Sequence, residues 1–259
     1  MHLISPSKVI RGKKAWLFAI KDILDITKTP LILGRSDATH NIRSRIRNDL
    51  ENNNLNVYSA NLEFDCCSED LDRIYKFAQQ KKCDSIIASG GGKVLDAGKL
   101  LAEYLSIPCI TIPLSASTCA GWTALANIYT KKGQFLKDVN LICCPELLIY
   151  DYSFLVTAPR KTLASGIADS LAKWYESTLT SSSSSDGIIQ QAIQISRVLR
   201  DQLFIDGQKA FKNYKESDQS WVNVVEGNGL TAGLIGGIGG ERCRTAAAHS
   251  LHNAITQLE

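Results

Sequence analysis

The sequence lacks the features that mark several classes of protein. Its net charge is only +3 over 259 residues, which is too small to argue for binding to nucleic acid or to an anionic membrane surface. It contains no run of about 18 apolar residues that would predict a transmembrane helix. The opening segment, MHLISPSKVIRGKKAW, lacks the apolar core of a secretory signal. We therefore expect no nucleic-acid partner and no membrane partner.

The eight cysteines lack the C-x-x-C spacing of zinc knuckles and redox motifs. Two pairs are adjacent in the sequence, and most of the eight fall within apolar runs, where a thiol behaves as a small apolar side chain. We therefore expect a protein of a reducing compartment, in the cytoplasm.

What the sequence does contain, from residue 30 to about 115, is an alternation of short apolar segments with segments of helical periodicity. The predicted strands are 29–34, 55–60, 83–89 and 107–114, and the predicted helices are 41–53, 68–82 and 94–106. Ser68 is the expected N-cap of the second helix. This alternation predicts an α/β fold with a parallel sheet and helices on both faces.

After Pro159 the pattern becomes helical. Helices are predicted at 160–181, with a break near Gly166, at 188–214 and over the glycine-loosened segment 219–240. The glycine cluster GLIGGIGG (233–240) follows no strand, so we interpret it as helix loosening or close packing. The sequence thus predicts an α/β domain over 1–159 and a helical domain over 160–259. The motifs described next suggest nucleotide binding for the first domain, and metal and substrate binding for the second.

The segment SGGGKVLDAGK (89–99) places three glycines between a predicted strand and a predicted helix. Gly90, Gly91 and Gly92 allow the backbone to approach a ligand closely, and the positive end of the helix favours a pyrophosphate. Lys93 adds a point charge. The spacing is neither G-x-G-x-x-G nor that of a P-loop, so a plain tight turn remains the alternative.

Two further groups of polar residues suggest a site. The segment PLSASTCAGW (113–122) follows the next strand, and its hydroxyls either line the same crevice or form an ordinary polar loop. His249 and His252 lie three apart on a predicted helix and so share one side of it. With Asp169 they suit a divalent ion, although each is also compatible with a purely structural position.

Four segments, in the order GGGKVLDAGK, PLSASTCA, SGIADSLAKWYE and AAAHSLHNAIT, resemble the iron-containing (group III) alcohol dehydrogenase superfamily, and its glycerol dehydrogenase branch in particular. The resemblance runs from about residue 5 to the end of the sequence. It implies a dehydroquinate synthase-like architecture, with a Rossmann-like parallel-sheet domain followed by an all-helical domain. It also implies an NAD(P)-linked alcohol or polyol dehydrogenase with a divalent metal, zinc rather than iron, that forms homo-oligomers.

The resemblance also assigns roles to residues. Gly90, Gly91, Gly92 and Lys93 would bind the cofactor pyrophosphate, and Ser117, Leu125 and Tyr129 would lie near the nicotinamide half. Asp169 and His249 would bind the metal, and His252 would lie beside it as a catalytic residue near the substrate. An alcohol held at the metal would be acidified to an alkoxide and pass a hydride to the nicotinamide.

The sequence departs from the family pattern at three points. The family supplies a further metal histidine downstream of His249, which this sequence does not contain, so we expect a C-terminally truncated chain with an incomplete helical domain. Cys119 occupies the position of a substrate-binding aspartate, so glycerol is in doubt as the substrate. Arg35 could bind the 2′-phosphate of NADP. The resemblance favours NAD as the cofactor, with NADP as the alternative.

Two alternatives stay open at this stage. One is a non-catalytic nucleotide-binding remnant that lacks a complete metal site. The other is a lyase or synthase relative of the dehydroquinate synthase kind, although AAAHSLHNAIT fits the dehydrogenases better.

Overall fold

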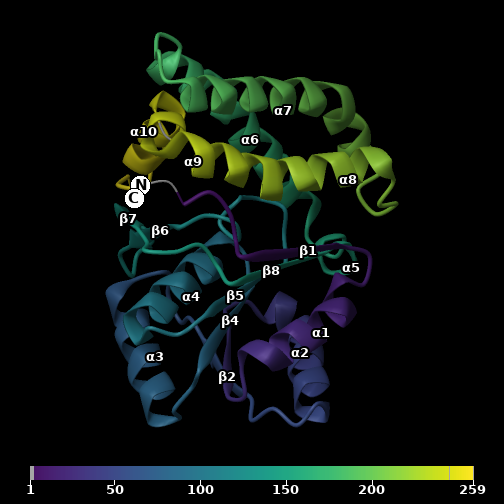
Figure 1. The fold of residues 1–259 in the computed structure, drawn as a ribbon, viewed down its shortest axis with the longest axis vertical. Coiled ribbons are helices and arrows are strands. Elements are labelled where there is room, and N and C mark those ends of the chain that lie inside the picture. The colour runs from purple at the N-terminus through teal and green to yellow at the C-terminus, as the bar shows by residue number, and fades with distance from the viewer. Residues whose placement is uncertain (1–2, 245, 259) are drawn as a thin grey trace. The chain divides into compact units, whose positions relative to one another are not determined.

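The structure is a computed structural model that describes residues 3–244 and 246–258. The chain divides into two compact units (Figure 1). The α/β unit comprises Pro6–Leu114 and Ala124–Leu155, and the helical unit comprises Met1–Ser5, Ser115–Thr123 and Val156–Glu259. The short segment Ser115–Thr123 thus groups with the helices, although it lies within the range predicted for the α/β domain.

The α/β unit is built on a six-stranded parallel sheet. In spatial order its strands are β1 (Lys8–Gly12), β8 (Leu147–Asp151), β5 (Cys109–Pro113), β4 (Ser85–Gly90), β2 (Pro30–Gly34) and β3 (Tyr58–Asn61). The four strands predicted from the sequence are β2 to β5, so the predicted parallel sheet is confirmed. The strands β1 and β8, which pair with each other in parallel, were not predicted.

Helices cover both faces of this sheet, as predicted. The helices of the unit are α1 (Ala15–Ile26), α2 (His40–Asn52), α3 (Ser68–Gln80), α4 (Gly92–Leu105) and the short α5 (Tyr152–Leu155), with a 3-10 turn at Asp37–Thr39. Trp16 of α1 and Leu50 of α2 pack with Ile87 and Ile110 of the sheet in one buried cluster. Gly98 of α4 packs against Ala88, which follows Ile87 in β4. Because successive side chains of a strand point to opposite faces, α4 lies on the other face of the sheet from α1 and α2.

The start of α3 differs from the prediction. Cys67 occupies the N-cap position and Ser68 is the first helical residue, so the prediction of Ser68 as N-cap was wrong. The Ser68 hydroxyl instead donates to Glu69 at 3.1 Å.

A two-stranded antiparallel hairpin, β6 (Leu125–Tyr129) with β7 (Phe135–Asn140), completes the α/β unit. A buried ion pair on α4 holds it: Lys99 Nζ lies 3.0 Å from Asp96 Oδ1 and also donates to the carbonyl of Leu125. Asp96 accepts the backbone N–H of Asn127 at 3.1 Å. Burial raises the pKa of Asp96, against the opposing effect of Lys99. Because both charges are buried and paired, this link specifies where β6 lies against α4.

The helical unit contains long antiparallel helices (Figure 1). Its elements are α6 (Arg160–Ser181), α7 (Gly187–Lys212), α8 (Gln219–Glu226), a π-helical turn (Gly227–Thr231), α9 (Ala232–Gly239), a 3-10 turn (Gly240–Cys243) and α10 (Ala247–Ile255). Within the described residues, no helix is both long enough and apolar enough to cross a membrane.

The glycines of the helical unit mark close contacts. Helix α6 runs unbroken through Gly166, so the predicted break was wrong. A Cβ at Gly166 would overlap the carbonyl oxygen of Ala116, and a Cβ at Gly233 would lie 2.5 Å from the Trp122 ring. Glycine is present at these positions because another segment passes too closely for a side chain. The interpretation of the 233–240 cluster as close packing is confirmed.

Candidate functional site

The glycine turn of the α/β unit lies where β4 meets α4. Gly90 ends the strand, Gly91 is the N-cap and Gly92 is the first helical residue. A Cβ at Gly90 would lie 2.7 Å from that of Val94, so the strand can meet the helix this tightly only with glycine there. Gly91 has no side chain with which to cap α4, and the N–H groups at the start of a helix have no acceptor within the helix itself. Such an end suits a phosphate group.

Lys93 in the first turn of α4 is already engaged. Its ammonium forms an ion pair with Asp65 and lies 4.8 Å from the centre of the Tyr129 ring. Asp65 is 3% exposed, and its other oxygen faces Arg35 at 3.4 Å. The two cations expected near the nucleotide thus share one carboxylate, which the sequence analysis missed.

The structure brings several of the predicted cofactor residues together within the α/β unit. Leu125 and Tyr129 are the first and last residues of β6, which the Asp96–Lys99 pair holds beside α4. The backbone N–H of Tyr129 donates to the backbone carbonyl of Cys66 at 2.8 Å. Burial raises the pKa of the Tyr129 hydroxyl to about 12, so this group is neutral near pH 7.

Ser117 and Cys119 belong to the helical unit, in the segment Ser115–Thr123. The Ser117 and Ser115 hydroxyls are 3.1 Å apart. Asn228 of the π-helical turn donates to the carbonyl of Ala116 at 3.1 Å, and Trp122 donates to the carbonyl of Ile4 at 2.9 Å. The segment is therefore fixed within the helical unit at both of its ends.

The helical unit also brings Asp169 and His249 together, although they are eighty residues apart. His249 Nε2 lies 3.2 Å from Asp169 Oδ1, and His249 Nδ1 lies 2.5 Å from Glu176 Oε2. Asp169 and Glu176 are seven residues apart on α6 and so face the same side. The Asp169 and His249 side chains are 26% and 25% exposed, whereas that of Glu176 is only 3% exposed. The imidazole thus contacts a buried carboxylate at Nδ1 and a partly exposed carboxylate at Nε2.

The electrostatics of the pair follow from these contacts. The hydrogen bond to Asp169 raises the pKa of His249, against the effect of burial. Burial alone would raise the pKa of Asp169, but the hydrogen bond from His249 and the charge of Lys173 outweigh it and the pKa is lowered. Asp169 is therefore a carboxylate near pH 7, available as a ligand.

Lys173 is a charged residue at this site that the sequence analysis did not identify. It lies one turn after Asp169 on α6, on the same side of the helix, and is 6% exposed. Burial would lower its pKa, but the neighbouring Cys119, Asp169 and Glu176 raise it, so the ammonium persists. A charged ammonium beside the pair gives the site a positive group that an anionic ligand could meet.

His252, predicted as the catalytic residue, lies one turn after His249 on α10 and is exposed.

The donor set can be compared with the needs of a divalent ion. In residues 3–244 and 246–258, no three His, Cys, Asp or Glu side chains form a metal site. Two predicted ligands, Asp169 and His249, lie next to each other. Tetrahedral zinc ligands at about 2.0–2.1 Å from the ion lie about 3.3 Å apart. The 3.2 Å between Asp169 and His249 matches this spacing. The carboxylate behind the histidine is also typical of metal-ligating imidazoles. The residues present therefore fit two ligands of such an ion.

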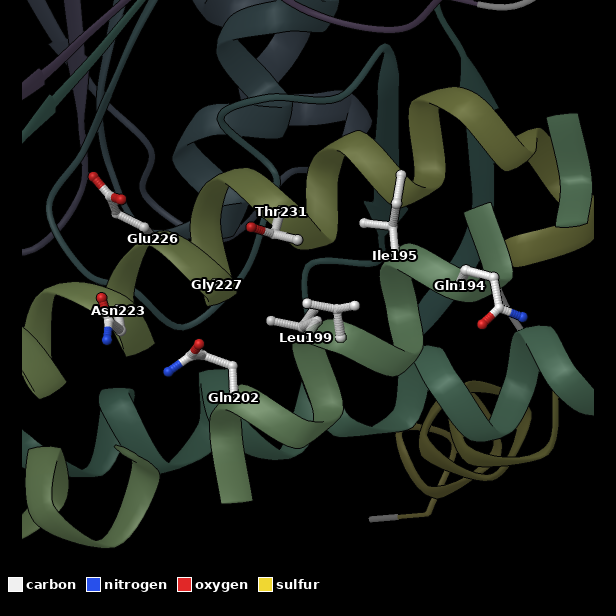
Figure 2. Close-up of a pocket in the computed structure, with 9 residues that line it drawn as sticks. Gln194, Ile195, Leu199, Gln202, Asn223, Glu226, Gly227 and Thr231 are labelled. Carbon is white, nitrogen blue, oxygen red and sulfur yellow. The ribbon is translucent and has the colours of Figure 1, made fainter. Parts of the chain in front are cut away.

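A separate groove of about 410 Å³ lies between α7 on one side and α8 with the π-helical turn on the other. Figure 2 shows Leu199 and Gln202 of α7 facing Asn223 and Thr231 across it. None of the residues predicted for the site lines this groove.

Comparison with known proteins identifies the family of this chain. Residues 6–152 match the family model of iron-containing alcohol dehydrogenase. The chain is 39% identical to an uncharacterized oxidoreductase of Synechocystis over 98% of this chain and 65% of that protein. It is 30% identical to a glycerol dehydrogenase of Pseudomonas putida over 97% of this chain and 70% of the relative.

A solved structure shows the same fold. A probable glycerol dehydrogenase of Sinorhizobium meliloti matches 99% of this chain with a TM-score of 0.87 and 26% identity, over 71% of its own length. The chain thus spans about two thirds of the length of these proteins. With the family match over residues 6–152 and the two units in the predicted order, the chain belongs to the iron-containing alcohol dehydrogenase family, in its glycerol dehydrogenase-like branch.

Proposed function

We propose that the protein is a metal-dependent, NAD(P)-linked alcohol or polyol dehydrogenase. The observation that carries the proposal is the Asp169–His249 pair, at the ligand spacing of a divalent ion and backed by Glu176. Membership of a dehydrogenase family supports it over the alternative of a non-catalytic nucleotide-binding remnant.

The dinucleotide is assigned to the glycine turn. The first N–H groups of α4, from Gly92 onward, would bind the pyrophosphate, with Lys93 supplying a positive charge once it leaves Asp65. Leu125, Tyr129 and Ser117 would border the nicotinamide half. We propose NAD as the cofactor; Arg35 keeps NADP open, because its guanidinium suits a 2′-phosphate.

Asp169 and His249 would hold the divalent ion, for which we propose zinc rather than iron. Bound there, the ion would supply Lewis-acid polarisation of the substrate oxygen. His252, exposed and one turn away, would lie toward the substrate. The partly exposed carboxylate and imidazole leave room for a small alcohol on this side of α6.

Lys173 favours a second candidate, a dehydrogenase of hydroxy acids. A buried ammonium near Asp169 and Cys119 suits a substrate that carries a carboxylate beside its hydroxyl. Cys119 is 8% exposed and is a poor acceptor for the hydroxyls of a polyol. Both features separate this site from one built for a neutral triol.

Two expectations accompany the proposal. The eight free thiols suit the cytoplasm, and we propose that the protein forms homo-oligomers.

Metal and nucleotide binding test the proposed function directly. The purified protein should bind about one Zn²⁺ and one NAD⁺ or NADH per chain, measured by metal analysis and calorimetry, and oxidise small alcohols or hydroxy acids. Asp169→Ala should lose the metal and the turnover but keep the nucleotide. Asp201→Ala, an exposed carboxylate on α7, is the matched control. Equal metal content and turnover in Asp169→Ala and wild type would contradict the proposal.

A further inference from the structure

Glu176 is a buried carboxylate behind the Asp169–His249 pair. It is 3% exposed and projects from α6 two turns after Asp169. A buried carboxylate is costly unless each oxygen has a partner. Both oxygens of Glu176 are satisfied by α10 and the residue before it, 70 and 73 positions later in the chain.

One oxygen holds the start of α10. Glu176 Oε1 accepts the backbone N–H of Ala246 at 2.7 Å and that of His249 at 3.0 Å. Ala246 is the N-cap of α10 and has no polar side chain, and no described side chain of the helix caps it locally. Glu176 therefore takes the place of a local cap, where a negative charge also complements the helix dipole.

The other oxygen faces the His249 ring. Glu176 Oε2 lies 2.5 Å from Nδ1. An ionised carboxylate can only accept hydrogen bonds, so this contact requires the proton on Nδ1. Asp169 competes for a proton on Nε2, but its oxygen is 3.2 Å away, whereas Glu176 Oε2 is 2.5 Å from Nδ1. The shorter contact keeps the single proton of the neutral imidazole on Nδ1. Nε2, which faces Asp169, then carries the lone pair.

We infer that Glu176 is the positioning residue of this site, which fixes where α10 begins and at the same time the tautomer in which His249 offers Nε2 to a divalent cation. The inference rests on the proposed function only for the cation. Glu176 Oε1 binds the N–H groups at the start of α10, and Oε2 holds the proton on Nδ1 of His249. A single side chain therefore fixes both where α10 begins and which nitrogen of His249 can bind a cation.

If Glu176 were purely structural, it would only cap α10 and would not affect the tautomer of His249. The Glu176→Gln substitution separates these two roles. The amide oxygen of the substituted side chain can still accept the two backbone N–H groups. Its amide nitrogen then faces Nδ1 and can only donate. His249 must accept there, so its proton moves to Nε2 and the cation loses its ligand atom. Glu176→Ala removes both roles.

The experiment measures tautomer, cap and cation binding separately on the full chain. The ¹⁵N shifts of the His249 ring are recorded without metal over a pH series that extends well above the usual histidine pKa of about 6.5, because Asp169 raises the pKa of His249. Amide hydrogen exchange at Ala246 and His249 reports the cap. Zn²⁺ affinity is measured by competition with a chromophoric chelator. Glu103→Gln, a carboxylate that accepts the N–H of Ile142 at 2.7 Å, is the matched control.

We expect Nδ1–H in the wild type and in Glu103→Gln, and Nε2–H in Glu176→Gln with amide protection retained. Zn²⁺ affinity should fall about 10- to 100-fold in Glu176→Gln, as for other partners behind a metal ligand. Glu176→Ala should lose amide protection as well. An unchanged tautomer in Glu176→Gln would overturn the inference. A wild type that binds no Zn²⁺ would instead overturn the proposed function, and the ring shifts would still decide the role of Glu176.

Discussion

Lys93, in the first turn of α4, forms its ion pair with Asp65 rather than leaving its ammonium free at the glycine turn. Asp65 is buried and also faces Arg35. The cations that a nucleotide phosphate would need are thus held in place by an internal anion. A bound phosphate would compete with Asp65 for Lys93.

Removing each partner should therefore have opposite effects on nucleotide affinity. Lys93→Ala should raise the Kd for NADH about tenfold, corresponding to ~1.4 kcal/mol, because a charge-assisted contact is lost. Asp65→Asn should lower the Kd, because Lys93 is released from its ion pair. Fluorescence titration with NADH measures both, and an unaltered Kd in Lys93→Ala would show that Lys93 does not contact the nucleotide.

Lys173 should decide between neutral and anionic substrates. Lys173→Met keeps the length of the side chain and removes the charge, so KM for a hydroxy acid should rise about 10- to 100-fold, as for the loss of a charged hydrogen bond. KM for a neutral diol should change little. Lys161→Met, an exposed lysine on the same helix, is the control in steady-state assays. A parallel change for both substrates would assign Lys173 to packing.

Gly166 should be intolerant of even one methyl group. A Cβ there overlaps the backbone carbonyl of Ala116, which cannot rotate away. We expect Gly166→Ala to cost about 1–3 kcal/mol and to lower Tm by roughly 2–4 °C for each kcal/mol. At Gly187, no described atom lies within 4 Å of an added Cβ, so Gly187→Ala should be neutral or slightly stabilising. Equal melting temperatures for both variants would contradict the close approach.

The Gly166 result also shows where sequence reasoning fails. Periodicity located β2 to β5 and the helices α2, α3, α4, α6 and α7, because local pattern decides them. Gly166 was taken as a helix break, because a glycine in a helical pattern looks like a breaker when its distant neighbour is unknown. The neighbour, Ala116, is fifty residues away, and no local signal reveals it.

Asp206 should make the packing of α7 on α8 sensitive to acid. It is buried and accepts hydrogen bonds from Gln202 and, at 2.7 Å, from Asn223. Burial would raise its pKa, but the hydrogen bonds from Asn223, Ser220 and Gln202 outweigh it and the pKa is lowered. The stability it contributes is therefore present above its unfolded value of about 3.9 and is lost as the pH falls through the folded pKa.

Urea unfolding over a pH series tests this. The free energy of unfolding of Asp206→Asn should lie below that of the wild type near neutral pH, and the two should converge below about pH 4. A difference that stays constant over the series would show that the carboxylate charge is not what Asp206 contributes.

The cysteines should differ in reactivity according to burial. Cys143 is exposed and Cys109 is buried. Burial raises the pKa of Cys109 to about 12, and partial burial with Glu103 and Glu146 raises that of Cys143. Iodoacetamide should therefore modify Cys143 first, faster as the pH rises, because the thiolate is the nucleophile. Peptide mass spectrometry checks the order, with Cys143→Ser as control, and early modification of Cys109 would contradict the buried position.

The site was predictable only in part. Asp169 and His249 were identified by resemblance, and the structure brings them within 3.2 Å. Glu176 was inside a quoted motif but was missed, since a glutamate in a helix is ordinary. Its spacing of seven from Asp169 marks a shared face and is the signal that could have found it. Its partner N–H groups belong to backbone seventy residues later, which no pattern reveals.

The strand β8 lies between β1 and β5, and Lys8 to Gly12 pair with Leu147 to Asp151. On a ribosome, β1 therefore emerges nearly 140 residues before its neighbour β8 is synthesised. Until then β5 presents an open edge to the surroundings, where a foreign strand can attach. Closure of the sheet is a late, long-range event that is expected to limit the folding rate. Chains released before residue 151 should depend on chaperones to stay out of aggregates.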